Sequence, residues 1–211
     1  MICVSISSLR DLKLAVAQGV EMLELRMDLL KADPEQVWGM IPDGIPTIAT
    51  CRPGAISRDE RMRMLSTCIR LGASCIDVEL EEGAAFKSAL IALARKHNCE
   101  VIISYHHYES TPAPAELEDI LRACYEAGAD IAKLATRVNK ETEAAALLGL
   151  YRLPGRKVIL GMGNHGRITR LAAPSLGAEF TFASVGKGSE TAPGQFDQQQ
   201  LKDIYSIINR S

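Results

Sequence analysis

The ten residues 128–137, GADIAKLATR, contain the junction that decides the fold. Gly128 closes the amphipathic stretch AELEDILRACYEAG (115–128), and glycine is the residue most often found just past the end of a helix. The run DIAKLAT (130–136) then follows at once, and its length and apolar character are typical of a buried strand. The stretch therefore predicts a helix that turns at a glycine and leads directly into a strand.

The same junction recurs along the chain. Amphipathic stretches at 8–19 and 58–72 also end in a glycine, Gly19 and Gly72. Strict alternation of strand and helix predicts parallel strands joined by crossover helices. The strand-like runs lie at 2–6, 21–28, 46–52, 75–80, 100–106, 130–136, 157–162 and 180–185.

The eight strands, the seven helices between them and a closing helix at 197–210 predict an α/β fold of the (β/α)8 TIM-barrel class. An open doubly wound sheet is the main alternative. Such a sheet favours a Gly-rich phosphate turn after its first strand, and VSISSLRD (4–11) has no glycine. Because the sequence has no linker, repeat or low-complexity tract, we expect residues 1–211 to form a single barrel domain.

The composition narrows the choice of partners and of cellular location. A formal net charge of -2 gives no reason to expect nucleic acid or a membrane as partner. The sequence shows no signal peptide and no membrane-spanning run, and the six cysteines form no C-x-x-C pair. We therefore expect a cytoplasmic protein with reduced thiols. The four histidines show no metal-ligand spacing to these cysteines, so no metal is expected.

The active site of a (β/α)8 barrel lies at the C-terminal ends of its strands. Basic side chains gather at these ends and in the loop that holds Arg170, which predicts a cationic pocket for a small carboxylate. Polar residues and one methionine are expected at this end of the barrel: Ser5, Glu24, Arg26, Asp28, Arg52, Glu79, Ser104, His106, Lys133 and Met162.

Several of these residues also have a structural interpretation. Arg26 and Glu24 are expected to form at least in part an internal salt bridge. Arg52, taken alone, fits a solvated loop residue equally well. His106, taken alone, fits a hydrogen-bonded core histidine. Side chains alternate along a strand, so only one of His106 and His107 can line the barrel.

Lys133 is the hardest residue to explain structurally, because a lysine is costly to bury in a short apolar strand. Inside a barrel and among arginines, its ammonium is expected to be desolvated and repelled, and both effects favour the neutral amine. A neutral amine attacks a ketone or an aldehyde. We therefore predict that Lys133 forms a Schiff base with the substrate.

Six motifs, taken together and in this order, make the chain similar to the type I 3-dehydroquinate dehydratases, the Schiff-base enzymes of the shikimate pathway. The resemblance runs from the first strand to the last loop. The motifs are ELRMD (24–28), TCRPG (50–54), IISYHHYESTP (102–112), GADIAKLAT (128–136), GRITRLAAPSLGAEFTFASVG (166–186) and SETAPGQ (189–195).

The resemblance implies a (β/α)8 barrel and a hydro-lyase that converts 3-dehydroquinate to 3-dehydroshikimate without a cofactor. It also implies a cytoplasmic enzyme, and homodimers are common in the family. Lys133 resembles the family's imine-forming lysine, and His106 resembles its general acid/base. Arg170 is expected on the substrate carboxylate, and Met162 in the pocket wall. The substrate-binding residues that the resemblance assigns are Ser5, Glu24, Arg26, Arg52, Arg170, Thr191 and Gln195.

Two departures from the family pattern stand out. Family members often carry Glu-Gly-Gly shortly after the arginine matched by Arg52, and that glutamate is thought to orient the histidine. This chain has RPGAISRDE (52–60), where Glu60 can substitute only if the loop folds inward. Longer bacterial members also have an N-terminal β-hairpin across the barrel floor. The first predicted strand begins at residue 2, so we expect no hairpin and a floor that is open or plugged differently.

Two other functions fit the sequence less well. A class I aldolase shares the lysine chemistry but usually handles phosphorylated substrates, and the glycines of SVGKGSETAPGQ (184–195) keep it as an alternative. A non-catalytic barrel that binds carboxylates or a protein partner is the second alternative. The presence of every matched reactive residue argues against it.

Overall fold

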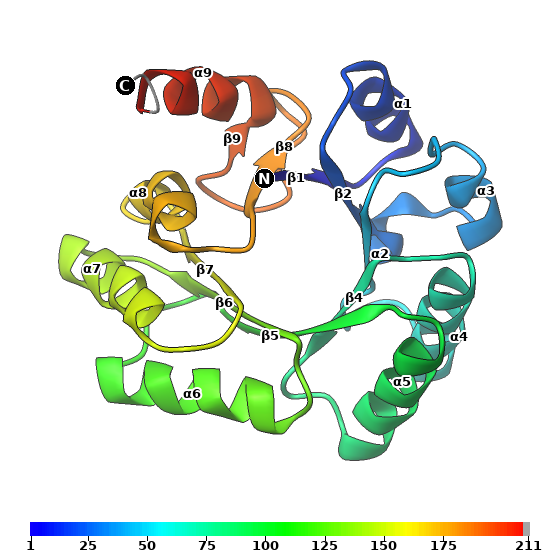
Figure 1. Cartoon of the computed structure of the whole chain (residues 1–211), viewed down its shortest axis with the longest axis horizontal. Coiled ribbons are helices and arrows are strands. Elements are labelled where there is room, and N and C mark those ends of the chain that lie inside the picture. The colour runs from blue at the N-terminus through cyan, green and yellow to red at the C-terminus, as the bar shows by residue number, and fades with distance from the viewer. Residues whose placement is uncertain (209–211) are drawn as a thin grey trace.

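The computed structural model describes residues 1–208, which form a ring of parallel strands with helices packed outside it (Figure 1). All eight predicted strands are confirmed, each within two residues of the expected ends. The barrel strands are β1 (Ile2–Ile6), β2 (Met22–Arg26), β3 (Thr47–Thr50), β4 (Cys75–Glu79), β5 (Glu100–His107), β6 (Ile131–Arg137), β7 (Lys157–Met162) and β8 (Thr181–Ser184).

Helices follow the strands as predicted, and the junction glycines have the expected backbone conformation. Gly19, Gly72 and Gly128 have φ of +63°, +94° and +100°, a region open to glycine without strain. The predicted closing helix 197–210 is observed from Gln198, and residues 209 and 210 lie outside the described residues. The main helices are α1 (Leu9–Ala17), α4 (Arg58–Arg70), α5 (Ala84–Lys96), α6 (Pro114–Glu126), α7 (Glu141–Gly149), α8 (Arg167–Ala172) and α9 (Gln198–Ile208).

Four short elements were not predicted from the sequence, and a fifth ends at the first residue of the stretch predicted as the closing helix. After β2 the chain forms two short helices, so the strand predicted to reach residue 28 ends at Arg26. Single turns of 3₁₀-helix follow α7 and α8. A short strand pairs with β8 on the side away from β1. The short elements are α2 (Met27–Leu30), α3 (Pro34–Trp38), the 3₁₀ turns Leu150–Arg152 and Ala173–Leu176, and β9 (Phe196–Asp197).

The strands pair in parallel in the order β7-β6-β5-β4-β3-β2-β1-β8, which makes a curled sheet with a seam between β7 and β8. Within residues 1–208 these two strands share no ladder. Backbone hydrogen bonds bridge the seam at both ends. Near the N-terminal ends of the strands, the Glu179 N–H donates to the Lys157 carbonyl at 3.2 Å. Beyond the C-terminal ends, the Gly163 N–H donates to the Pro193 carbonyl at 3.0 Å.

Alternation along the strands stacks the interior side chains in layers. The lowest layer fills the barrel floor and is apolar, so the floor is plugged by side chains. It consists of Cys3, Met22, Ile48, Cys75, Ile102, Ile131, Val158 and Phe180.

The next layer lies two residues further along each strand. It is polar on β1 to β6 and apolar on β7 and β8, and all of its members are buried. This layer is the floor of the functional pocket. Its members are Ser5, Glu24, Thr50, Asp77, Ser104, Lys133, Leu160 and Phe182.

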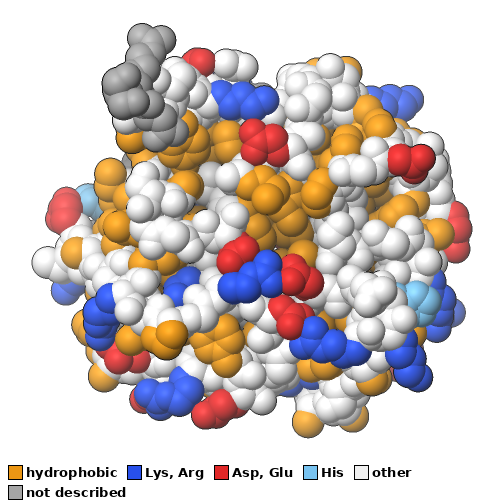
Figure 2. Space-filling view, viewed as in Figure 1, with side chains coloured by type: hydrophobic (Ala, Val, Ile, Leu, Met, Phe, Trp, Pro, Cys, Tyr) orange, Lys and Arg blue, Asp and Glu red, His pale blue; other side chains and the backbone are white. Residues whose placement is uncertain are grey.

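Hydrophobic side chains lie near the centre of the face shown in Figure 2, and a group of acidic and basic side chains lies beside them. At the N-terminal ends of the strands, Arg156 forms ion pairs with Glu100 and Glu179. No helix within residues 1–208 is both long and apolar enough to cross a membrane. The same residues contain no cluster of three or more His, Cys, Asp or Glu side chains that could hold a metal ion.

Candidate active site

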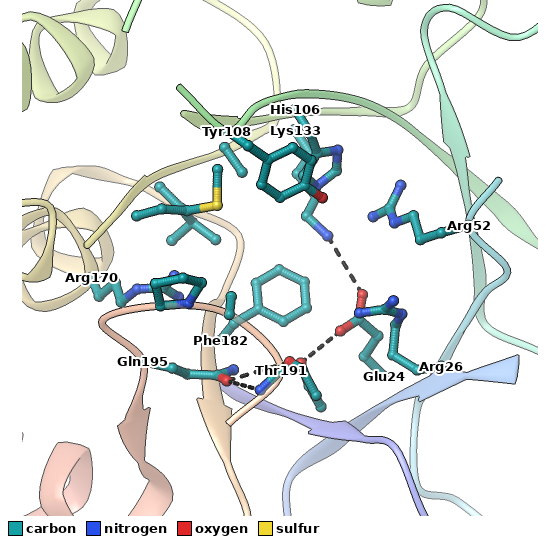
Figure 3. Close-up of a pocket in the computed structure, with 16 residues that line it drawn as sticks. Glu24, Arg26, Arg52, His106, Tyr108, Lys133, Arg170, Phe182, Thr191 and Gln195 are labelled. Carbon is teal, nitrogen blue, oxygen red and sulfur yellow. Dashed lines mark hydrogen bonds and ion pairs between the residues drawn. The ribbon is translucent and has the colours of Figure 1, made fainter. Parts of the chain in front are cut away.

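A pocket opens at the C-terminal ends of the barrel strands (Figure 3). The structure brings together in it all nine predicted catalytic and substrate-binding residues, together with Met162 in its wall. The residues that line it are Ser5, Glu24, Arg26, Arg52, His106, Tyr108, Lys133, Ala135, Leu160, Met162, Arg170, Phe182, Thr191, Ala192, Pro193 and Gln195.

Lys133 lies in the middle of β6 and reaches the pocket floor with a side chain that is 5% exposed. Its Nζ is 2.8 Å from Asp77 Oδ2 and 3.5 Å from Glu24 Oε1, and it lies 4.2 Å from the centroid of the Phe182 ring. The expectation that arginines surround and repel Lys133 is therefore wrong. The nearest charged groups are two carboxylates, which compensate the buried ammonium.

Arg52 joins the strands beside Lys133 into one charged network. Its Nη2 donates to Asp77 at 2.9 Å, and its Nη1 donates to Glu79 at 2.6 Å and to Ser104 at 2.8 Å. The interpretation of Arg52 as a solvated loop residue is thus wrong. Although burial raises the pKa of the Asp77 carboxyl, Arg52 and Lys133 hold it well below its ordinary value, so Asp77 stays ionised.

The expected salt bridge between Arg26 and Glu24 is also wrong. Arg26 pairs with Asp28, with its Nη2 2.7 Å from Oδ2 and its Nε 3.0 Å from Oδ1. This pairing arises because the chain turns into α2 directly after Arg26 and brings Asp28 back toward it. Glu24 instead accepts hydrogen bonds from Ser5 at 2.6 Å and from Thr50 at 3.1 Å.

His106 lines the pocket, and His107 points to the other face of β5, as alternation predicts. The Nδ1 atom of His106 is 3.0 Å from Glu79 Oε2. Burial and the charge of Arg52 lower the pKa of His106 below its ordinary value of 6.5, although Glu79 opposes them. At neutral pH the imidazole is therefore mainly uncharged and able to accept a proton.

Arg170 enters the pocket from α8, opposite Arg52 in the view of Figure 3, and is 2% exposed. No ion pair to its guanidinium is found among the described residues, and its buried Nε has no hydrogen-bond partner there. Burial lowers the pKa of Arg170 to about 10, and Arg167 adds to this effect. The guanidinium remains charged at neutral pH and is therefore poised to receive an anion.

Replacing Arg170 with methionine is expected to raise KM for the substrate about 10–100-fold, because a buried charge partner of the substrate is lost. The free protein should be as stable as the wild type or more stable, by up to about 2 kcal/mol, since the buried charge has no counter-ion. Steady-state kinetics and thermal unfolding of Arg170→Met measure both effects. A fall in affinity with an unchanged or higher Tm is expected, and an unchanged KM would contradict the assignment.

The loop after β8 covers one side of the pocket with Thr191 and Gln195. The Gln195 side-chain oxygen accepts from the Thr191 N–H at 2.9 Å and lies 3.3 Å from its hydroxyl. Gly194 has φ +79°, and a Cβ there would meet the Gly163 carbonyl oxygen at 2.5 Å. Glycine is therefore required at residue 194 for the loop to pack against the end of β7.

The site residues missed from the sequence include Asp77, Tyr108 and Phe182. Asp77 lies two residues before Glu79 on β4, so the two side chains share one face of the strand. The alternation of side chains could therefore have predicted that Asp77 faces the barrel interior. Phe182 lies two residues after Phe180 on β8 and faces the interior as it does. Tyr108 lies just after β5, and nothing in its local pattern distinguishes it from an exposed loop tyrosine.

A buried lysine, a mainly uncharged histidine and an unpaired arginine thus share one pocket at the C-terminal end of a parallel barrel. This fold and this site define a barrel enzyme for a small anionic substrate. The family model for type I 3-dehydroquinase matches residues 2–211. The chain belongs to the type I 3-dehydroquinase family, and it is therefore a hydro-lyase.

Relatives and solved structures agree with this assignment. The 3-dehydroquinate dehydratase of Methanococcus vannielii is 35% identical, and the match covers 99% of this chain and all of the relative. The crystal structure of 3-dehydroquinate dehydratase from Aquifex aeolicus superposes with a TM-score of 0.88 at 26% identity, with 100% of each chain covered.

A third comparison is the type I 3-dehydroquinate dehydratase of Clostridium difficile, solved with covalently modified comenic acid. Its TM-score is 0.86 at 25% identity, with 98% of this chain and 91% of that chain covered. The family assignment favours a dehydratase over the class I aldolase alternative.

Proposed function

We propose that this chain dehydrates 3-dehydroquinate to 3-dehydroshikimate through a Schiff base on Lys133, with His106 as general acid and base. The observation that carries the proposal is the position of Lys133 and His106 on one wall. Residue 104 of β5 pairs with Lys133, and His106 pairs with Ala135, so the two side chains are diagonal neighbours on the same face.

The residues divide the reaction between binding and proton transfer. The unpaired guanidinium of Arg170 takes the carboxylate, and Ser5, Arg26, Thr191 and Gln195 hold the ring. Arg26 and Arg52 are each anchored by carboxylates, so their positions are fixed before the substrate arrives. Anchoring lowers the entropy lost when the substrate is oriented.

The chemistry then follows from the lysine and the histidine. Lys133 transfers its proton to a base in the pocket, and its amine adds to the ring ketone; loss of water from the carbinolamine gives an iminium. His106 takes a proton from the adjacent carbon, and the electron pair moves to the nitrogen to give an enamine. The enamine expels the hydroxyl as His106 returns the proton, so a molecule of water leaves. Water then hydrolyses the imine, which releases the product and Lys133.

Asp77 and Glu24 have a defined part in this scheme. They pair with the ammonium before the reaction and can balance the positive iminium after it. Burial raises the pKa of Glu24, but the charges of Lys133, Arg26 and Arg52 together lower it below its ordinary value. Both carboxylates therefore remain weak bases, and His106 is better suited to move the protons.

Borohydride reduction in the presence of 3-dehydroquinate tests the covalent step. Reduction of the imine is expected to fix the ligand on Lys133 and to abolish tryptic cleavage after it, which mass spectrometry of the peptides detects. The same treatment without substrate is the control. An active preparation that keeps Lys133 unmodified would contradict the mechanism.

Cellular context and assembly follow from the same proposal. We place the enzyme in the shikimate pathway of the cytoplasm, and the six free, buried cysteines support a reducing compartment. The expected partners are a small carboxylate substrate and a second copy of the chain in a homodimer, and nucleic acid is not expected as a partner. Residues 1–211 are proposed to form one catalytic domain.

A further inference from the structure

The imidazole of His106 borders two hollows, so packing alone does not fix its orientation. It lines the active-site pocket, and it also lines a second hollow together with Pro53, Arg61 and Glu79. The ring of Tyr108 stacks on that of His106, with 6.1 Å between the ring centroids, but Tyr108 is itself 66% exposed. A ring with open space on two sides needs a directional contact to keep one orientation.

Glu79 supplies that contact, and its own position is fixed. It is the last residue of β4 and pairs with Ser104 of β5. One carboxylate oxygen is 3.0 Å from His106 Nδ1, and the other accepts from Arg52 Nη1 at 2.6 Å. Arg52 is held in turn by Asp77 and Ser104. The carboxylate therefore has little freedom to rotate or to leave the histidine.

The loop after Arg52 contributes no group to this contact. Glu60, the carboxylate that an inward fold of the loop would bring to the histidine, is exposed in the first turn of α4. Its backbone N–H donates to the Ser57 hydroxyl there at 3.2 Å. The inward fold of the loop that Glu60 would need in order to substitute is therefore not observed.

We propose that Glu79 is the positioning residue of the dehydration: it fixes the tautomer and the orientation of His106. A carboxylate at Nδ1 holds the proton on that nitrogen, which leaves the lone pair on Nε2, the other edge of the ring. This inference rests on the proposed role of His106. Glu79 acts through the histidine and does not itself line the substrate pocket.

Substitution of Glu79 separates this role from a merely structural one. Glu79→Gln is expected to lower kcat about 10–100-fold, as removal of a group that orients a functional histidine typically does. Arg52 keeps two of its three contacts, so KM should change less than about threefold. Glu82→Gln is the matched control, because Glu82 also pairs with a buried arginine, Arg61, but does not touch His106. Its kcat should stay within about twofold of wild type.

The pH profile gives an independent readout. The charged groups that face His106 are Arg52, Asp77, Glu79 and Lys133. Glu79 raises the pKa of His106 against the effects of burial and Arg52. Removing its charge lowers that pKa further, so the acidic limb of kcat/KM, below pH 6.5, should move to lower pH in Glu79→Gln. The acidic limb of the kcat/KM profile should not move in Glu82→Gln.

Nitrogen NMR of the free enzyme measures the tautomer of His106 directly. It therefore tests the role of Glu79 separately from the dehydration reaction. The chain has four histidines, so the His106 signals are those lost in His106→Ala. We expect an Nδ1-protonated tautomer in the wild type and a mixture of tautomers in Glu79→Ala. An unchanged tautomer in that variant, or equal kinetic effects of Glu79→Gln and Glu82→Gln, would overturn the inference. A wild-type enzyme that shows the expected tautomer but does not dehydrate 3-dehydroquinate would instead overturn the proposed function.

The same variants form a cycle with His106. If Glu79 acts through the histidine, Glu79→Gln should change kcat less than about twofold in a His106→Ala background. A full 10–100-fold effect in that background would mean that Glu79 acts independently of His106 and would also overturn the inference.

Discussion

Lys133→Met is expected to lower turnover of 3-dehydroquinate by at least about 10⁴-fold, because no other group in the pocket can supply the imine. Methionine keeps most of the buried volume but leaves Asp77 and Glu24 without the ammonium. Asp77 retains Arg52 as partner, so the fold should persist. Initial rates, followed by the appearance of the enone chromophore, measure the effect.

Lys157→Met is a matched control for the loss of a buried lysine. Lys157 lies at the start of β7 and donates to the carbonyls of Leu153 and Gly155, far along the barrel from the pocket floor. Its replacement should lower the Tm because two carbonyls lose a donor, while kcat stays within about threefold. More than about 1% residual turnover in Lys133→Met would contradict the Schiff-base assignment.

His106→Ala is expected to lower kcat by about 10²–10⁴-fold, the usual contribution of a general acid or base. The variant should still bind substrate and become trapped by borohydride on Lys133, since the lysine and Arg170 are unchanged. Single-turnover trapping followed by mass spectrometry separates imine formation from turnover.

His107→Ala provides the comparison for that result. His107 has the same residue type and the neighbouring place on β5, but its Nδ1 contacts the Ser110 backbone outside the pocket. Its kcat should remain within about threefold of wild type. If His107→Ala were the slower variant, the assignment of the two side chains to opposite faces of β5 would be wrong.

Local sequence patterns were enough to predict the strands and the strand ends that form the pocket. The alternation of side chains predicted that only one of His106 and His107 lines the barrel, and the glycines at the helix ends marked where strands begin. Both signals depend on residues within a few positions of one another. This is why Ser5, Lys133 and Arg170 could be placed in one pocket from the sequence.

The charge pairing inside the pocket could not be predicted in the same way, because it depends on register between strands. Asp77 meets Lys133 across 56 positions of sequence, with β5 between their strands. Arg26 pairs with Asp28 because the chain leaves the sheet earlier than its apolar pattern suggested. A lysine expected to be repelled by arginines is consequently matched by carboxylates.

The seam between β7 and β8 gives substrate binding a second effect. Arg170 follows β7, Thr191 and Gln195 follow β8, and within the described residues these strands are joined only at their ends by backbone hydrogen bonds. In the proposed binding mode, one small molecule touches both sides of the seam. The bound substrate then links the two sides of the seam between β7 and β8. Substrate binding therefore adds a connection across the ring that the described backbone makes only at the strand ends.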